Sequence, residues 1–193
     1  MQPIRVILAS GSPHRLALLE TAGFKVQVVR PHVVEPDLAG FALLDAGLRY
    51  LALLKAESVR QQGHSGLILA ADTVGLVNGQ PFGKPADRAE AARMLAAISG
   101  TTHAVLTGWC LLRGSDGLAL CGVERTGITM RPWSTAERAA YLDSEEWIGK
   151  SGAYGLQPDD PFVTHMEGSR SNVIGIPVER ILAVLNQWTD FTS

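Results

Sequence analysis

One carboxylate stands inside a run of apolar residues, where an acidic side chain is unusual. The run covers residues 68–74, Ile-Leu-Ala-Ala-Asp-Thr-Val, and the acid is Asp72. A short apolar run is typical of a buried strand. A carboxylate inside a protein is costly unless a cation, a metal ion or hydrogen bonds compensate it. Asp72 is therefore either a strand-end acid satisfied by loop amides, or a basic or metal-binding carboxylate in a cleft.

A second candidate site is the segment from Ser10 to Arg15, which reads Ser-Gly-Ser-Pro-His-Arg. It lies between an expected strand and an expected helix, and the N–H groups at a helix N-terminus attract anions. The guanidinium of Arg15 suits bidentate contact with phosphate. An ordinary capped helix with a solvated arginine is the alternative. The segment lacks both the Walker and the dinucleotide glycine fingerprints.

Two lysines and a glutamate are further candidates. Lys55 lies on the apolar stripe of a predicted helix over residues 41–62, so its ammonium either reaches out to water or points into a cleft. Lys84 lies in a rigid Gly-Lys-Pro loop, and Glu35 lies in a loop bounded by prolines. Glu35 and Asp72 together would supply the oxygen ligands that Mg²⁺ uses alongside substrate phosphates.

A loop of small residues, Ser151–Gln157, carries one phenol and one amide. Such a loop either presses against a planar ligand or is an ordinary surface loop.

The bulk properties narrow the class of protein. The chain has 193 residues, a net charge of −2 and 46% hydrophobic residues. These values predict one domain over residues 1–193, or two tightly joined lobes, without a broad surface for nucleic acid. No apolar run has membrane-spanning length, and residues 1–5 lack the features of a signal peptide, so we expect a cytoplasmic protein without a membrane partner.

The periodicity of apolar residues predicts an α/β protein with a mixed sheet. We expect strands over residues 4–9, 24–29, 67–77, 103–113, 118–130 and 162–167 and helices over 13–22, 41–62, 87–98, 135–142 and 177–188. Asn78-Gly79 predicts a hairpin turn. Residues 31–40 and 145–160 are expected to be loops, and residues 168–175 a turn-rich stretch. Thr135 is the expected cap of its helix.

Cys110 and Cys121 flank another predicted hairpin turn. They face each other if Ser115-Asp116 is the central pair of that turn, and they do not if Asp116-Gly117 is. We expect free thiols in either case.

The ordered set of motifs resembles the Maf family of nucleotide pyrophosphatases over nearly the whole chain. The matching segments are Leu8–Arg15, Ala71-Asp72-Thr73, Gly83-Lys84-Pro85, Ser99-Gly100, His103, Thr107-Gly108, Gly152–Gln157 and Glu167–Pro177. The resemblance implies a two-lobed α/β fold around a mixed sheet, similar to that of inosine triphosphate pyrophosphatases, with the nucleotide in a cleft between the lobes.

The resemblance also implies a reaction: hydrolysis of a nucleoside triphosphate to the monophosphate and pyrophosphate, with Mg²⁺ or Mn²⁺. By position, Asp72 would be the general base and, with Glu35, would hold the metal. The same comparison assigns phosphate binding to Ser10, Arg15, Lys55 and Lys84, and the choice of base to His14, Thr73 and Gln157. A homodimer is suggested in the same way.

Residue 14 departs from the family signature, because His14 stands where arginine is usual and gives up a permanent charge. The Gly-Ala-Tyr-Gly-Leu-Gln loop resembles the branch that acts on dTTP, UTP and modified pyrimidine triphosphates, limiting their incorporation into nucleic acids. A 7-methyl-GTP or purine-directed pyrophosphatase, and a non-hydrolytic nucleotide-binding regulator of septum formation, are the alternatives.

Overall fold

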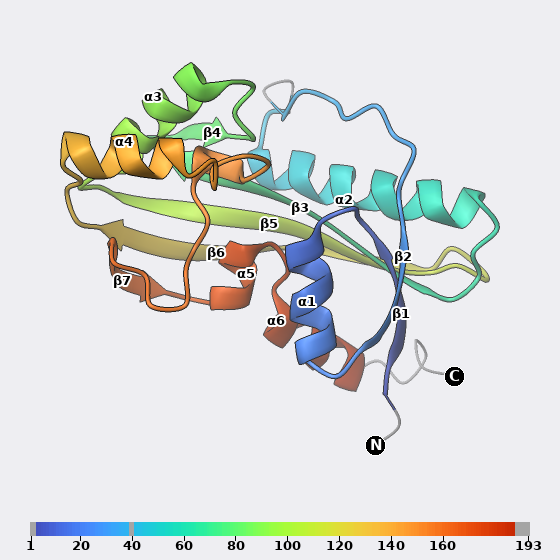
Figure 1. Cartoon of the computed structure of the whole chain (residues 1–193). Helices are drawn as coiled ribbons and strands as arrows, with labels where there is room; N and C mark the ends of the chain where they lie inside the picture. The colour runs from blue at the N-terminus through green and yellow to red at the C-terminus, as the bar shows by residue number, and fades with distance from the viewer. Residues whose placement is uncertain (1–2, 39–40, 188–193) are drawn as a thin grey trace. The chain divides into compact units, whose positions relative to one another are not determined.

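Helices and strands follow one another along most of the chain (Figure 1). A computed structural model describes residues 3–38 and 41–187. The elements are β1 (Arg5–Ala9), α1 (Pro13–Thr21), β2 (Lys25–Val29), α2 (Leu44–Gln61), β3 (Leu67–Val77), β4 (Gln80–Phe82), α3 (Arg88–Ile98), β5 (Thr102–Arg113), β6 (Ala119–Met130), α4 (Thr135–Asp143), the 3₁₀ turn η2 (Ser151–Ala153), β7 (Val163–Glu167), α5 (Arg170–Ile174) and α6 (Val178–Gln187). None of these helices is long and apolar enough to cross a bilayer.

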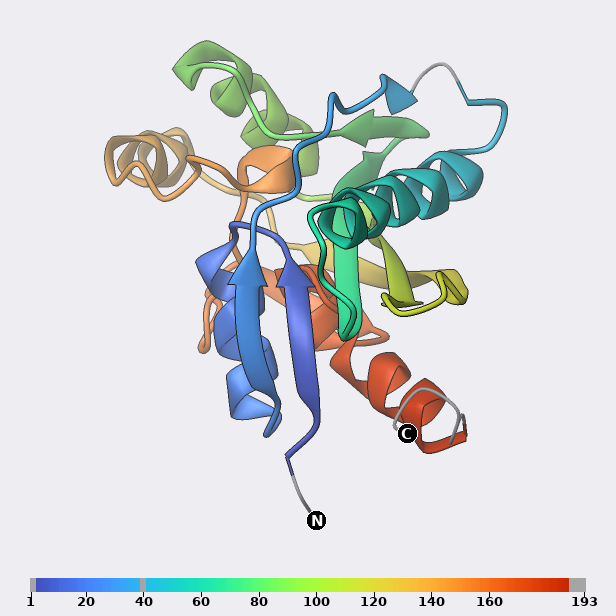
Figure 2. The same cartoon turned by 90° about the vertical axis from the view of Figure 1, so that its right-hand side faces the viewer.

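The strands of the described chain form one seven-stranded sheet, in the order β2-β1-β3-β5-β6-β7, with β4 paired to β3. β1 runs parallel to both β2 and β3, whereas β4 is antiparallel to β3 and β7 is antiparallel to β6. Figure 2 shows β1 and β2 side by side with their arrowheads pointing the same way. The predicted mixed sheet of an α/β protein is thereby confirmed.

Two compact units make up the chain. The first comprises the described parts of residues 1–72, 107–124 and 175–193, and the second comprises residues 73–106 and 125–174. The division falls inside β3, β5 and β6, so each of these strands contributes to both units.

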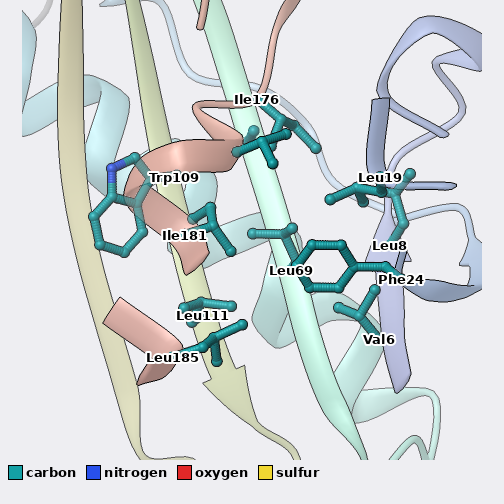
Figure 3. Close-up of a cluster of buried hydrophobic side chains, with 12 residues drawn as sticks. Val6, Leu8, Leu19, Phe24, Leu69, Trp109, Leu111, Ile176, Ile181 and Leu185 are labelled. Atoms are coloured by element: carbon teal, nitrogen blue, oxygen red, sulfur yellow. The ribbon is translucent and has the colours of Figure 1, made fainter. Parts of the chain in front are cut away.

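Strand alternation in the first unit sends successive side chains to two different groups of helices. Leu69 and Ala71 of β3 pack in a cluster with Leu19 of α1 and with α6 (Figure 3). Ile68 and Ala70 pack in the other cluster, which includes α2. Because the period of a strand is two residues, the next even-numbered residue of β3, at position 72, is directed toward the α2 side.

The second unit has its own core. It is formed by α3, α4, the end of β6 and Trp133, whose ring stacks on Phe162 at a centroid distance of 3.6 Å. The predicted turn at Asn78-Gly79 is confirmed, since Val77 pairs with Gln80 and the two central residues have φ of 50° and 78°. Such positive φ values are those of the two-residue turns that join hairpins.

Three local predictions were wrong. α2 begins at Leu44 rather than at residue 41, because residues 41–43 form a bend before the helix. The N-cap of α4 is Ser134 and not Thr135, and Ser134 makes a capping box with Glu137. Residues 170–174 form the short helix α5 inside the stretch that was predicted to consist of turns. The predicted ends of a loop at Gly40 and of the last helix at Trp188 lie outside the described residues.

The hairpin of β5 and β6 adopts the register with Ser115-Asp116 at its centre. The N–H of Arg113 donates to the carbonyl of Leu118 at 2.8 Å. In this register Cys110 and Cys121 face each other, and their side chains share a hydrogen bond. Both are free thiols, as expected.

Candidate active site

Asp72 is held against a lysine rather than against loop amides. Its Oδ1 accepts a hydrogen bond from Nζ of Lys55 at 2.6 Å, and 16% of its side chain is exposed. The alternation of β3 directs residue 72 toward α2, and Lys55 lies on the face of α2 that also buries Ala52, Ala56 and Val59. The buried side of the helix therefore carries one cation, at the place where the strand presents one acid.

Lys55 forms ion pairs with two carboxylates. Oε1 of Glu35 lies 2.8 Å from Nζ, so two carboxylates converge on one ammonium group. The Lys55 side chain is only 8% exposed, whereas that of Glu35 is 56% exposed. An ammonium buried to this degree is costly unless it is paired and hydrogen-bonded. The alternative in which Lys55 simply reaches out to water is therefore wrong.

Arg15, in the first turn of α1, adds a second cation. Ser12 caps α1 by accepting the N–H of Arg15 at 3.4 Å, and Pro13 occupies the first turn. The guanidinium of Arg15 donates from Nε to the carbonyl of Gly175 at 2.9 Å and from Nη1 to Oγ of Ser10 at 3.2 Å. These bonds fix its plane beside the N-terminus of α1.

The pKa of Arg15 depends on its burial and on the two acids of the cluster. Burial lowers the pKa of Arg15, while the negative charges of Asp72 and Glu35 raise it. A guanidinium group keeps its proton in proteins. Arg15 is therefore a permanent positive charge within electrostatic reach of both acids.

Two carboxylates of the cluster are donors that could serve a hard divalent cation. Glu35 and Asp72 offer carboxylate oxygens that already converge on a positive group. In residues 3–38 and 41–187, no three or more histidine, cysteine, aspartate or glutamate side chains gather where they could hold a metal ion. Two carboxylates completed by substrate phosphates and water are the arrangement that Mg²⁺ favours, and the residues present fit that arrangement.

The structure thus brings together Ser10, Arg15, Glu35, Lys55 and Asp72 in the first unit. His14 lies next to Arg15 in the first turn of α1 and is exposed. Lys84, Thr73 and Gln157 belong to the second unit.

Three segments of the second unit that carry predicted site residues are tied together by hydrogen bonds. The carbonyl of Thr73 accepts from Oγ of Ser151 at 2.6 Å, and the carbonyl of Gly83 accepts from the N–H of Gly152 at 2.9 Å. The start of the Ser151–Gln157 loop is therefore fixed beside Thr73 and beside the loop of Lys84. Lys84 itself is exposed.

Three polar residues that bond to Gln157 were not predicted from the sequence as part of the site. Glu146, Asp160 and Arg170 all bond to Gln157. Glu146 and Asp160 lie in what reads as an irregular loop, where an acidic residue is by default a solvated one. The turn signal of Pro158–Pro161 marks a bend, but it does not say which groups the bend brings together.

The fold and this cluster define an α/β protein that holds two acids and two cations, one of the cations in the first turn of α1, an arrangement suited to phosphate ligands. Comparison with known sequences identifies the family of this chain. Residues 5–188 match the family model described as Maf-like protein, and the chain belongs to the Maf family.

Several relatives are similar over nearly the whole chain. A protein of Desulfitobacterium hafniense (strain Y51) named dTTP/UTP pyrophosphatase is 40% identical over 190 residues, which cover 95% of this chain and 85% of the relative. A Bacillus anthracis protein of the same name is 35% identical over 185 residues and 95% of each chain. A solved structure titled nucleoside-triphosphatase / dITP/XTP pyrophosphatase, from Mycobacterium abscessus, is 20% identical over 95% of both chains, with a TM-score of 0.45.

Proposed function

We propose that this protein hydrolyses nucleoside triphosphates, dTTP and UTP among them, to the monophosphate and pyrophosphate. Membership of the Maf family and the names of relatives at 35–40% identity support the reaction class. The observation that carries the assignment of residues is the contact of Lys55 with both Asp72 and Glu35, within electrostatic reach of the guanidinium of Arg15. The proposed place of action is the cytoplasm.

Asp72 is the proposed general base. Its carboxylate accepts a proton from the attacking water, whose oxygen bonds to the α-phosphorus while the anhydride bond between the α- and β-phosphates breaks and pyrophosphate leaves. Lys55 fixes the direction of Oδ1, which leaves the second carboxylate oxygen for the water. Position and hydrogen-bond reach, rather than basicity alone, are what a general base needs.

Charge neutralisation is the second requirement of phosphoryl chemistry. Arg15, Lys55 and Lys84 are the proposed cations, and Ser10 and the N-terminus of α1 offer hydrogen-bond donors to the phosphates. Glu35 and Asp72 would hold a divalent cation such as Mg²⁺ or Mn²⁺, which neutralises phosphate charge when bound. His14, Thr73 and Gln157 are the proposed contacts to the base.

The direct test is release of pyrophosphate from a panel of triphosphates in the presence of Mg²⁺ or Mn²⁺. The panel contains dTTP, UTP, CTP, ITP and 7-methyl-GTP. We expect turnover of dTTP and UTP above the others. Faster turnover of ITP or 7-methyl-GTP would show a purine-directed enzyme. Binding without any release of pyrophosphate would show a regulator instead.

Asp72→Asn tests the assigned base within that assay. Removal of a general base costs about 10²- to 10⁴-fold in rate, so we expect a loss of kcat in that range with nucleotide binding retained. Asp143→Asn is the matched control, because Asp143 is an exposed acid that pairs with Arg88 on the surface. Full turnover by Asp72→Asn would remove Asp72 from this role.

A further inference from the structure

Gln157 is held from three directions, which is more than an ordinary loop residue needs. Its N–H donates to Oδ2 of Asp160 at 3.0 Å, and its carbonyl accepts from the guanidinium of Arg170. Its side-chain Nε2 donates to Oε2 of Glu146 at 2.6 Å. Both the backbone and the amide of Gln157 therefore have defined positions.

Asp160 closes the loop around this residue. Its Oδ1 accepts from the N–H groups of Phe162 and Val163 at 3.0 and 2.9 Å, and its Oδ2 also accepts from the phenol of Tyr154. One carboxylate thus binds four donors across residues 154–163. These bonds within the chain fix the position of the loop that carries Gln157.

Glu146 sets the orientation of the side-chain amide of Gln157. A carboxylate only accepts hydrogen bonds, so it faces the NH₂ group and never the carbonyl oxygen. The orientation of an amide is otherwise ambiguous, because its two ends have the same shape. Because Glu146 accepts from Nε2 of Gln157, Oε1 of Gln157 points the other way and can accept a hydrogen bond from a different group.

We propose that Glu146 is a positioning residue for base selection: by holding the NH₂ of Gln157, it presents the amide oxygen to a base that carries an N–H at its Watson–Crick edge. This inference rests on the proposed function and on the role of Gln157 in it. Uracil and thymine carry a hydrogen on N3 and offer such a donor. Cytosine has a lone pair at N3, which would meet the amide oxygen as one acceptor against another.

The test changes the hydrogen-bonding character of residue 146 while Gln157 is left intact. Glu146→Gln offers both a donor and an acceptor, so either orientation of the Gln157 amide is satisfied. Glu146→Lys offers donors alone and turns the carbonyl of Gln157 toward itself. We measure kcat/KM for UTP and CTP in each variant, and the dissociation constants of UMP and CMP.

The preference for UTP over CTP should fall by about tenfold in Glu146→Gln, because rotation of the Gln157 amide relieves the mismatch of two facing acceptors. It should fall further in Glu146→Lys. Glu145→Gln is the matched control, with the same change of charge one residue away, and should keep the wild-type preference. Glu145 makes no hydrogen bond to Gln157 in the described part of the chain.

A merely structural role for Glu146 would lower the turnover of both nucleotides equally and leave their ratio unchanged. An unchanged ratio in both variants, with normal UTP hydrolysis, would overturn the inference and spare the proposed function. Failure of the wild-type protein to hydrolyse any triphosphate would instead overturn the proposed function itself. Should a variant be poorly active, the ratio of UMP to CMP affinities decides in the same sense.

Discussion

Lys55 shows at the scale of one residue how a functional charge is accommodated inside a protein. Its neighbours on the buried face of α2 are apolar, and Lys55 occupies a position where an apolar side chain is expected. Burying its ammonium group carries a desolvation cost. Two carboxylates within 2.8 Å offset that cost. The sequence marked Lys55 and Asp72 as unusual, because each is a charge inside an apolar pattern. It could not show that they touch, since they lie on different elements.

The difference between stability and function can be measured at this position. In Lys55→Met the apolar side chain fills a similar volume, but Asp72, whose side chain is 16% exposed, loses its cation. Removing one partner of a buried ion pair leaves the other charge uncompensated, so the free energy of unfolding should fall by about 3 kcal/mol. We expect kcat/KM to fall by about a hundredfold or more, since an electrostatic contact to the phosphates is lost.

Arg60→Met on the same helix is the control for this prediction, because Arg60 pairs with Glu57 at 2.7 Å on the more exposed side of α2. It should leave turnover unchanged. Full activity in Lys55→Met would contradict the phosphate-binding role, whatever the denaturation curves show.

The elements differ in how well the sequence predicted them. The short apolar runs of β1 and β3 and the Asn78-Gly79 turn were sufficient, because each pattern is local and strong. α5 was missed, because a five-residue helix built from Arg-Ser-Asn-Val-Ile has no apolar period to detect. The cap of α4 was displaced by one residue, since Ser134 and Thr135 are both good caps and the reciprocal bond with Glu137 decides between them.

The capping box of α4 predicts a dependence of stability on acid. Hydrogen bonds from Arg131 and then from Ser134 lower the pKa of Glu137 to about 2. A carboxyl group with a lowered pKa in the folded state stabilises the protein above its ordinary pKa, and this contribution is lost as the pH falls from about 4.5 to about 2. Glu137→Gln removes the titrating group.

We therefore expect stability to fall less steeply in Glu137→Gln than in the wild type over that window. Urea denaturation at a series of pH values measures the two slopes. Parallel slopes would mean that Arg131 and Ser134 do not favour the charged form of Glu137 in solution.

The described residues form two compact units, although the sequence contains no linker between them. A single domain or two joined lobes both fit a chain of 193 residues, and the composition does not change where the division falls. The positions of the division inside β3, β5 and β6 follow from contacts between residues far apart in sequence, which no local pattern records. The proposed site residues are accordingly distributed over both units, as Asp72 and Thr73 show.

Ligand binding gives a test on the scale of the whole protein. A ligand that binds only the folded state stabilises it by about 2.7 kcal/mol at a concentration of 100 times its Kd. For a chain of this size that corresponds to a rise in Tm of roughly 5–10 °C. We expect such a rise for Asp72→Asn with dTTP and Mg²⁺, in a scan where turnover does not consume the ligand. A rise with ATP and none with dTTP would contradict the pyrimidine assignment.

The alternation of β3 has a consequence for how this stretch of sequence can vary. Ile68 and Ala70 are buried on the α2 side of β3, and Asp72 points to the same side because it follows them at intervals of two residues. The number of residues in this segment therefore matters more than their identity. Apolar exchanges there preserve the acid's direction, whereas an insertion or deletion of one residue would turn it to the opposite side of the sheet, away from Lys55. Natural variation in this segment should therefore proceed by replacement and never by change of length.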